Sequence, residues 1–289
     1  MSEQSAALGM VPPRSRAHEN EAEGRTAKGT AVSLFKFRAA LPRRLEIAIA
    51  VGASVITILG WEVAVRFGWI SSLFFPPPSV VMARLWQMTV HDDLLYQAGV
   101  STLRVWVAFI LSVVMAVPIG IIMSSYRIVG VALEPIVDFI RYLPVPALVP
   151  LSIIWLGVGD TTKIFLLWLG TFFQLVLLVA DDTRRTPNEY VEIAYTVGAK
   201  PRQILTDVLF RSMLPSLFDS LRITLGWCWT YLIVAEIVAA DSGLGFVIWT
   251  ARRYMQTTDV MAGVVAIGLI GLVTDQILRR LHTRLFRYL

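Results

Sequence analysis

Four ionisable residues stand within long apolar segments, where a charge is costly and has to be paired or used. Asp138 and Arg141 are three residues apart, so on a helix they share one face and can form an ion pair. Arg222 and Glu236 lie towards opposite ends of a later apolar segment that also contains Trp227. A guanidinium in such a setting is suited to contact an anionic solute, so these five residues are the candidates for a solute path.

A purely structural interpretation of the same residues remains open. Asp138 can hold Arg141 so that the pair only ties helices together, and we favour this slightly over a contact with solute. For Arg222 and Glu236 the structural interpretation is favoured more strongly, and Trp227 is of a type that commonly packs between membrane helices.

The sequence offers no residues for metal binding, redox chemistry or catalysis. His18, His91 and His282 are far apart, and the single cysteine, Cys228, lies within an apolar run. The stretch 157–163 contains two glycines and a lysine but lacks the Gly-Lys-Ser/Thr ending that binds nucleotide phosphates. We therefore expect no cofactor and no catalytic activity in this chain.

The hydrophilic loop at about residues 182–215 has a pattern typical of two short helices joined by a tight turn. A first helix is predicted over residues 189–197, and Gly198 follows where a glycine commonly ends a helix. Pro201 is suited to the first position of a second helix, which leads towards Pro215. Such a stiff element at a membrane surface can transmit a push from a soluble partner to the flanking helices.

The elements that position these residues are predicted to be membrane-spanning helices, each needing about 20 apolar residues. The third of them contains Glu134, Asp138 and Arg141 and then Pro144, Pro146 and Pro150, so it must be kinked or face protein rather than lipid. We predict an all-α integral membrane protein with about six spans, over residues 45–65, 103–123, 131–156, 164–180, 217–240 and 260–281.

Composition agrees with a membrane protein. Of the 289 residues 56% are hydrophobic and 16% are charged, against about 25% charged residues in soluble domains. The net charge of +5 is better explained by basic residues at membrane edges than by binding to nucleic acid. Residues 1–40 are polar and basic without a hydrophobic period, which predicts a disordered tail before a membrane domain over residues 41–289.

Lysine and arginine are more frequent in loops on the cytoplasmic side of a membrane. If the N-terminus is cytoplasmic, most of the 26 basic residues fall in the tail, in the loop at 182–215 and after the last span. This predicts that both termini are cytoplasmic.

The loop also carries a recognisable motif. Glu192-Ile-Ala194, Gly198 four residues later, and Leu214-Pro215 resemble the EAA-type signature of permeases in binding-protein-dependent ABC importers, with Ile193 in place of the usual alanine. Phe75-Pro-Pro-Pro-Ser79 and Gly243-Leu-Gly-Phe246 are similar to the nitrate, sulfonate and taurine subgroup. The resemblance extends from about Leu45 to the C-terminus.

The resemblance implies the type I importer permease fold and a coupling helix that docks into a groove on an ATPase subunit. In that role Glu192 makes a polar contact, Ala194 allows close approach, Gly198 provides the turn, and Ala199 and Pro201 complete the loop. The implied partners are a second permease copy in a homodimer, two cytoplasmic subunits that bind ATP and magnesium, and an extracytoplasmic solute-binding protein. The implied location is the bacterial inner membrane, and the implied solute is a small anion of the nitrate, sulfonate or taurine type.

Two other classes stay open at this point. A secondary transporter driven by an ion gradient would have repeated halves with paired broken helices, and no convincing repeat is found. A membrane-embedded enzyme would need clustered histidines or carboxylates near the spans, and the histidines are scattered.

Overall fold

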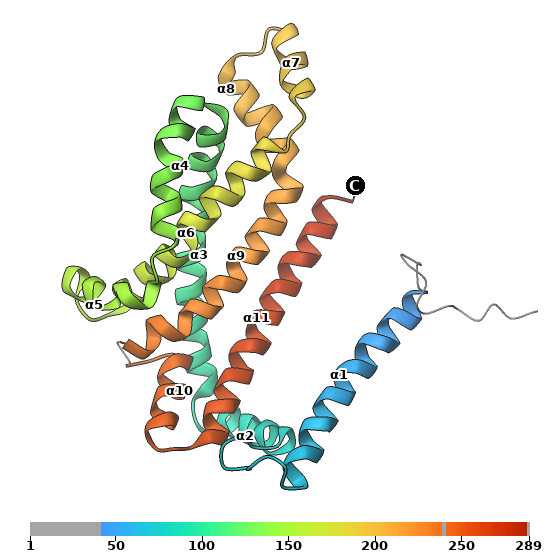
Figure 1. Ribbon diagram of the computed structural model, residues 1–289, viewed down its shortest axis with the longest axis vertical. Coiled ribbons are helices and arrows are strands. Elements are labelled where there is room, and N and C mark those ends of the chain that lie inside the picture. Colours follow the sequence, from blue (N-terminus) through green and yellow to red (C-terminus); the bar gives the residue numbers. More distant parts are fainter. Residues whose placement is uncertain (1–41, 239–240, 288–289) are drawn as a thin grey trace, which may run out of the picture. The chain divides into compact units, whose positions relative to one another are not determined.

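The computed structural model describes residues 42–238 and 241–287 (Figure 1). The regular elements of these residues are all helical, which confirms the predicted all-α class. In chain order they are α1 (Arg43–Arg66), α2 (Pro78–His91), α3 (Leu94–Ser125), α4 (Arg127–Arg141), α5 (Val145–Leu156), α6 (Asp160–Arg184), α7 (Asn188–Thr196), α8 (Pro201–Gln203), the π-helical turn η2 (Ile204–Leu209), α9 (Phe210–Val238), α10 (Leu244–Arg253) and α11 (Thr257–Leu285).

The chain divides into two units, residues 1–57 and 58–289, with the boundary inside α1. The first unit contributes the start of α1 to the described residues, and the predicted disordered tail at 1–40 lies outside them. The last part of α1 belongs to the second unit, where Glu62 accepts hydrogen bonds from the Ser79 backbone N–H (3.0 Å) and hydroxyl (2.7 Å). This caps the start of α2, because first-turn N–H groups lack helical partners.

Helices form at all six predicted spans, but they are not equally apolar. Within residues 42–238 and 241–287, four helices are long and apolar enough to cross a membrane: α1, α3, α6 and α11. The pair α4 and α5 makes a fifth if it counts as one span. The remaining predicted span forms α9, which has 29 residues but includes the charged Asp219, Arg222 and Glu236.

The third predicted span is broken rather than continuous. The axes of α4 and α5 differ by 98°, and Tyr142, Leu143 and Pro144 join them. Pro144 precedes α5, and Pro146 lies in its first turn. Prolines restrict the residue before them and supply no N–H, so they favour a helix start here over a continuous helix.

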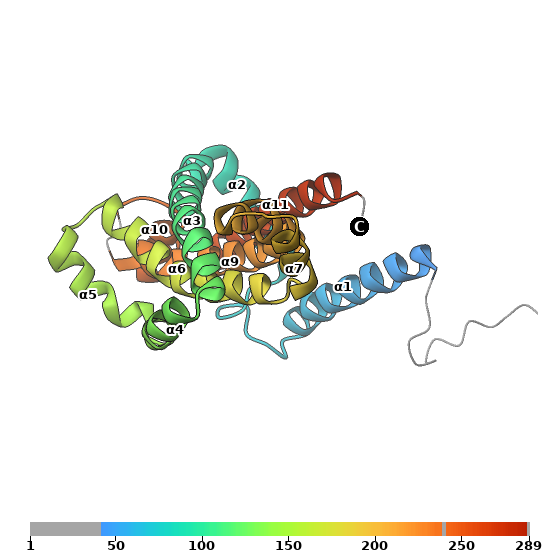
Figure 2. The ribbon, with the colours of Figure 1, turned by 90° about the horizontal axis from the view of Figure 1, so that it is seen from above.

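The second unit is built around α6, whose contacts with α3 and with α9 are the most extensive between helices of the described residues. Figures 1 and 2 show α6 crossing beside both partners. The approach to α3 is close, because a Cβ on Gly120 would lie 2.7 Å from the Val179 side chain. Buried aliphatic residues such as Leu167 and Leu175 fill the space between the helices.

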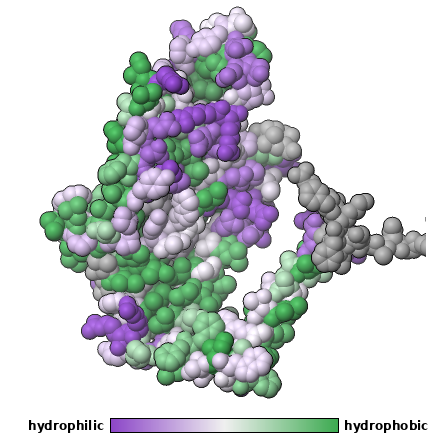
Figure 3. Space-filling model, in the orientation of Figure 1, coloured by the Kyte–Doolittle hydropathy of each residue, from purple (hydrophilic) through white to green (hydrophobic). Residues whose placement is uncertain are grey.

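The two ends of this unit differ. The hairpin of α7 and α8 lies at one end, and α2 and α10 lie at the other (Figure 1). On the face shown in Figure 3, hydrophobic residues cover a broad area, with hydrophilic clusters above it towards the α7 end. Outward-facing residues such as Leu103, Val114 and Leu272 are more than half exposed, which suits contact with lipid.

Candidate coupling surface and solute path

The predicted helix–turn–helix is present and its turn is made by glycine. Gly198 follows α7 with φ +80°, a left-handed conformation that residues with a Cβ adopt at a cost. The Gly198 and Ala199 N–H groups donate to the Tyr195 and Ala194 carbonyls at 3.0 Å, which ends the helix. Pro201 is the first residue of α8, as its missing N–H favours.

The hairpin holds itself together through one small apolar cluster. Ala194 of α7 is 7% exposed and packs with Ile204 and Leu209 of η2. The small Ala194 side chain therefore allows α7 to pack closely against η2 within the hairpin. Glu192 is exposed and makes no ion pair within the described part of the chain.

The outer face of α7 is apolar and uncovered. Ile193 is 61% exposed and Val197 78%, with Tyr190 and Tyr195 also more than half exposed. The broad hydrophobic area in the lower part of Figure 3 lies away from the α7 end. An exposed apolar patch rimmed by polar residues commonly marks a surface that binds another protein.

The candidate solute-path residues lie at different places in the structure. Arg141 and Trp227 lie together, because both line a cavity of about 200 Å³ between the α4–α5 bend, α6 and α9. Arg141 forms an ion pair with Asp138 at 3.0 Å, as the sequence spacing predicted. Its guanidinium also lies over the Tyr142 ring, 4.6 Å from the ring centre.

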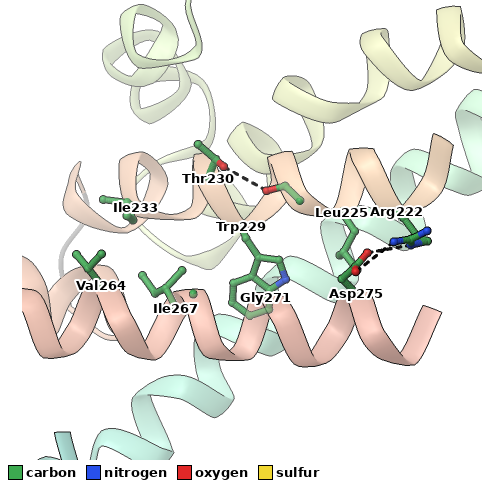
Figure 4. A pocket seen from close by; sticks show the side chains of 11 residues that line it. Arg222, Leu225, Trp229, Thr230, Ile233, Val264, Ile267, Gly271 and Asp275 are labelled. Carbon is green, nitrogen blue, oxygen red and sulfur yellow. Dashed lines mark hydrogen bonds and ion pairs between the residues drawn. The ribbon is translucent and has the colours of Figure 1, made fainter. Parts of the chain in front are cut away.

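Arg222 lies elsewhere, in a cavity of about 450 Å³ between α9 and α11 (Figure 4). Its Nε and Nη2 donate to the two carboxylate oxygens of Asp275 at 2.9 and 3.2 Å. A bidentate pair of this kind fixes two planar groups firmly. Apart from this pair and Thr230, the cavity is lined by apolar side chains and glycine, as Figure 4 shows. Arg222 therefore ties α9 to α11.

Glu236 is at the opposite end of the unit and is fully buried. It accepts hydrogen bonds from Arg104 Nη1 (2.7 Å), from the Ser101 hydroxyl (2.8 Å) and from the Gly245 N–H (2.7 Å). The Leu244 N–H in turn donates to Ser101 Oγ at 2.8 Å. Glu236 and Ser101 together satisfy the free N–H groups at the start of α10.

A second buried cation, Lys163, extends this cluster. Its ammonium group contacts Asp241 and lies 3.8 Å from Asp160, while Arg104 Nη2 donates to Asp160 at 2.5 Å. Burial raises the pKa of Asp241, but hydrogen bonds from Lys163 and Ser242 and the charges of Lys163 and Arg104 outweigh it, so the pKa lies below its ordinary value. The cluster joins α3, α6, α9 and the start of α10 by paired charges.

Sequence reasoning missed Arg104 and Lys163 as members of a site. Both could have been found from the sequence, because a charge inside or at the edge of an apolar helix rarely lacks a partner. The sequence does not predict which carboxylate each cation pairs with, since Arg104 and Glu236 are 132 residues apart.

Comparisons with known proteins agree with this architecture. A family model described as "Binding-protein-dependent transport system inner membrane component" matches residues 116–287. The taurine transport system permease protein TauC of Escherichia coli is 32% identical over 255 residues, covering 86% of this chain and 92% of that protein. The putative aliphatic sulfonates transport permease protein SsuC of the same organism is 30% identical, covering 78% of this chain and 86% of that protein.

A solved structure has the same fold. A chain of the MetNI methionine ABC transporter, in an inward-facing conformation, superimposes with a TM-score of 0.53 and 23% identity. The match covers 65% of this chain and 95% of that one.

Proposed function

We propose that this chain, which belongs to the family of binding-protein-dependent transport system inner membrane components, admits a small sulfonate-type anion to the cell. Membership makes it an ABC transporter permease, and the ion-gradient alternative is not favoured. The proposal concerns its solute, its partners and its orientation.

The solute class is supported by the relatives. TauC is named for taurine and SsuC for aliphatic sulfonates, and both kinds of solute carry a sulfonate group. A sulfonate is a compact anion with three acceptor oxygens, so its path needs hydrogen-bond donors and a positive charge.

The observation that carries the coupling role is the uncovered apolar face of α7. Ile193 and Val197 are exposed to 61% and 78% on a hairpin that the Gly198 turn keeps rigid. Burying such residues against a partner is favourable by about 25 cal/mol for each Å² of apolar surface covered. The occupant is a cytoplasmic ATPase subunit that binds ATP and magnesium, with Glu192 at the edge of the contact.

The α7 end is then the cytoplasmic end, and α2 and α10 face outwards to the solute-binding protein. Both termini are cytoplasmic under this orientation, since basic residues are enriched in the loop at 182–215 and after α11. Two copies of the permease with two ATPase subunits complete the importer.

Uptake by the reconstituted complex tests the proposal. The permease, its ATPase and its binding protein are placed in liposomes, and entry of radiolabelled taurine is followed with and without ATP. We expect uptake that requires ATP and the binding protein and persists when ion gradients are dissipated. Uptake that follows an ion gradient without ATP, or no uptake of any sulfonate, would contradict it.

A further inference from the structure

The cavity at the α4–α5 bend differs in chemistry from the cavity between α9 and α11. Its lining residues come from the α4–α5 bend, α6 and α9. Figure 1 shows the end of α4 about halfway along the second unit. The volume of the cavity, about 200 Å³, is below the 300–1,000 Å³ that suit drug-sized ligands, so it fits a smaller molecule.

The polar side chains that line the cavity all present hydrogen-bond donors, and no carboxylate is among its lining residues. They are Arg141 from α4, Gln174 from α6, and Trp227 and Tyr231 from α9. The guanidinium and the indole N–H can only donate, whereas the amide and the phenol can donate or accept. A lining of this composition favours an anion over a cation.

These donors are largely unused within the protein. Gln174, Trp227 and Tyr231 make no side-chain hydrogen bond to any residue in 42–238 or 241–287. Arg141 donates from Nη2 to the Tyr142 hydroxyl at 3.0 Å, which leaves its Nη1 without a partner in the same part of the chain. Its Nε is buried, and the contact with Asp138 at 3.0 Å lacks the alignment of a hydrogen bond.

The backbone around the cavity holds these groups in place. A Cβ on Gly170 would lie 2.7 Å from the Tyr231 ring, so only glycine lets the ring lie against α6 here. Val145, the first residue of α5, also lines the cavity, which puts the positive end of that helix dipole beside it.

We infer that this cavity binds the sulfonate head of the solute during transport, with Arg141 as the charge partner and Gln174, Trp227 and Tyr231 as donors. This rests on the proposed import of a sulfonate-type anion. This assignment differs from the structural interpretation, in which Arg141 only pairs with Asp138 and does not contact the solute.

Direct binding to the permease separates the two interpretations. The permease–ATPase complex is purified in lipid nanodiscs without the binding protein, and equilibrium binding of radiolabelled methanesulfonate and taurine is measured. We expect saturable binding that Arg141→Gln weakens by about tenfold or more, because a hydrogen-bonded charge partner is lost. Tyr231→Phe, which removes one hydroxyl, weakens it roughly threefold.

Two further variants sharpen the test. Asp138→Asn removes the ion-pair partner of Arg141 but no residue of the cavity lining, so methanesulfonate should bind at least as tightly as before. Arg66→Gln is a matched control, because Arg66 is also ion-paired, with Glu62 at 2.6 Å, but does not line this cavity. It should leave binding unchanged.

The outcomes distinguish this inference from the proposed function. If the unaltered complex transports taurine with its binding protein but shows no saturable binding of its own, the cavity assignment is wrong and the import function stands. If Asp138→Asn weakens binding as much as Arg141→Gln, or if Tyr231→Phe has no effect, the ion pair is structural and the assignment is also wrong. If the unaltered complex neither binds nor transports any sulfonate, both fail.

Discussion

Arg104 and Glu236 form an ion pair of 2.7 Å with almost no contact with the surface, their side chains being 3% and 0% exposed. The pair connects the first half of α3 to the last turn of α9. Two charges removed from solvent are costly unless each is paired and hydrogen-bonded, and both conditions hold here. The pair therefore makes the α10 end of the unit sensitive to substitution.

Glu236→Gln should destabilise the protein by about 3–5 kcal/mol, because it leaves the Arg104 guanidinium buried with less compensation. Thermal unfolding of the detergent-solubilised permease measures the effect. Glu134→Gln is the control: Glu134 pairs with Arg184 at 3.1 Å, but both are about 40% exposed, so a change of about 0–1 kcal/mol is expected. Equal losses for the two variants would contradict the role given to burial.

The contact of Lys163 with Asp241 should persist into acid solution. The folded-state pKa of Asp241 is lowered, so its contribution to stability is fully present above the ordinary aspartate value of about 3.9. That contribution is lost only as the pH falls through the lowered value. The difference in melting temperature between the unaltered chain and Asp241→Asn should thus be the same at pH 7 and at about pH 5, and shrink below about pH 4. A difference that already disappears at about pH 5 would exclude a stabilised carboxylate.

Gly198→Ala should reduce transport strongly while the protein still inserts and elutes normally. The left-handed backbone at φ +80° costs a residue with a Cβ about 1–2 kcal/mol, which shifts the hairpin away from this turn. Gly99→Ala adds the same methyl group within helix α3, where nothing lies within 4 Å, and should leave uptake unchanged. Normal uptake by a Gly198→Val variant would exclude a coupling role for the turn.

Ile193→Asp should abolish the stimulation of ATP hydrolysis by solute-loaded binding protein. Ile193 is 61% exposed, so the change costs little folding stability but places a charge in the proposed ATPase contact. Ile193→Leu keeps the apolar surface and should retain most of the stimulation. Co-purification of the ATPase with each variant provides the second readout, and full co-purification with Ile193→Asp would show that the contact lies elsewhere.

Local features of this protein could be predicted from the sequence. The Gly198 turn and the start of α8 at Pro201 each depend on the conformational limits of one residue. The prolines at 144 and 146 indicated a kink, and the structure adds its size, 98°. The pairing of Asp138 with Arg141 followed from helical spacing alone.

Contacts between distant segments could not be predicted in this way. Arg141 and Trp227 meet at one cavity because α9 packs beside the α4–α5 bend, which no local pattern encodes. Arg222 and Glu236 were grouped with them on charge alone, yet their partners are Asp275 on α11 and Arg104 on α3. The charges of α9 also explain why it is not among the helices that are apolar enough to cross a membrane by composition, although a span was predicted there.

The π-helical turn η2 determines where the apolar face of α7 points. A π-helical turn accommodates one residue more than an α-helical turn does, and each α-helical residue turns the chain by about 100°. Deleting one residue between Ile204 and Leu209 would restore α-helical spacing and rotate the hairpin about the α9 axis by roughly that angle. Ile193 would then point to another side of the molecule although its own sequence context was untouched. The direction in which the proposed ATPase contact faces thus depends on a single additional residue in a different helix.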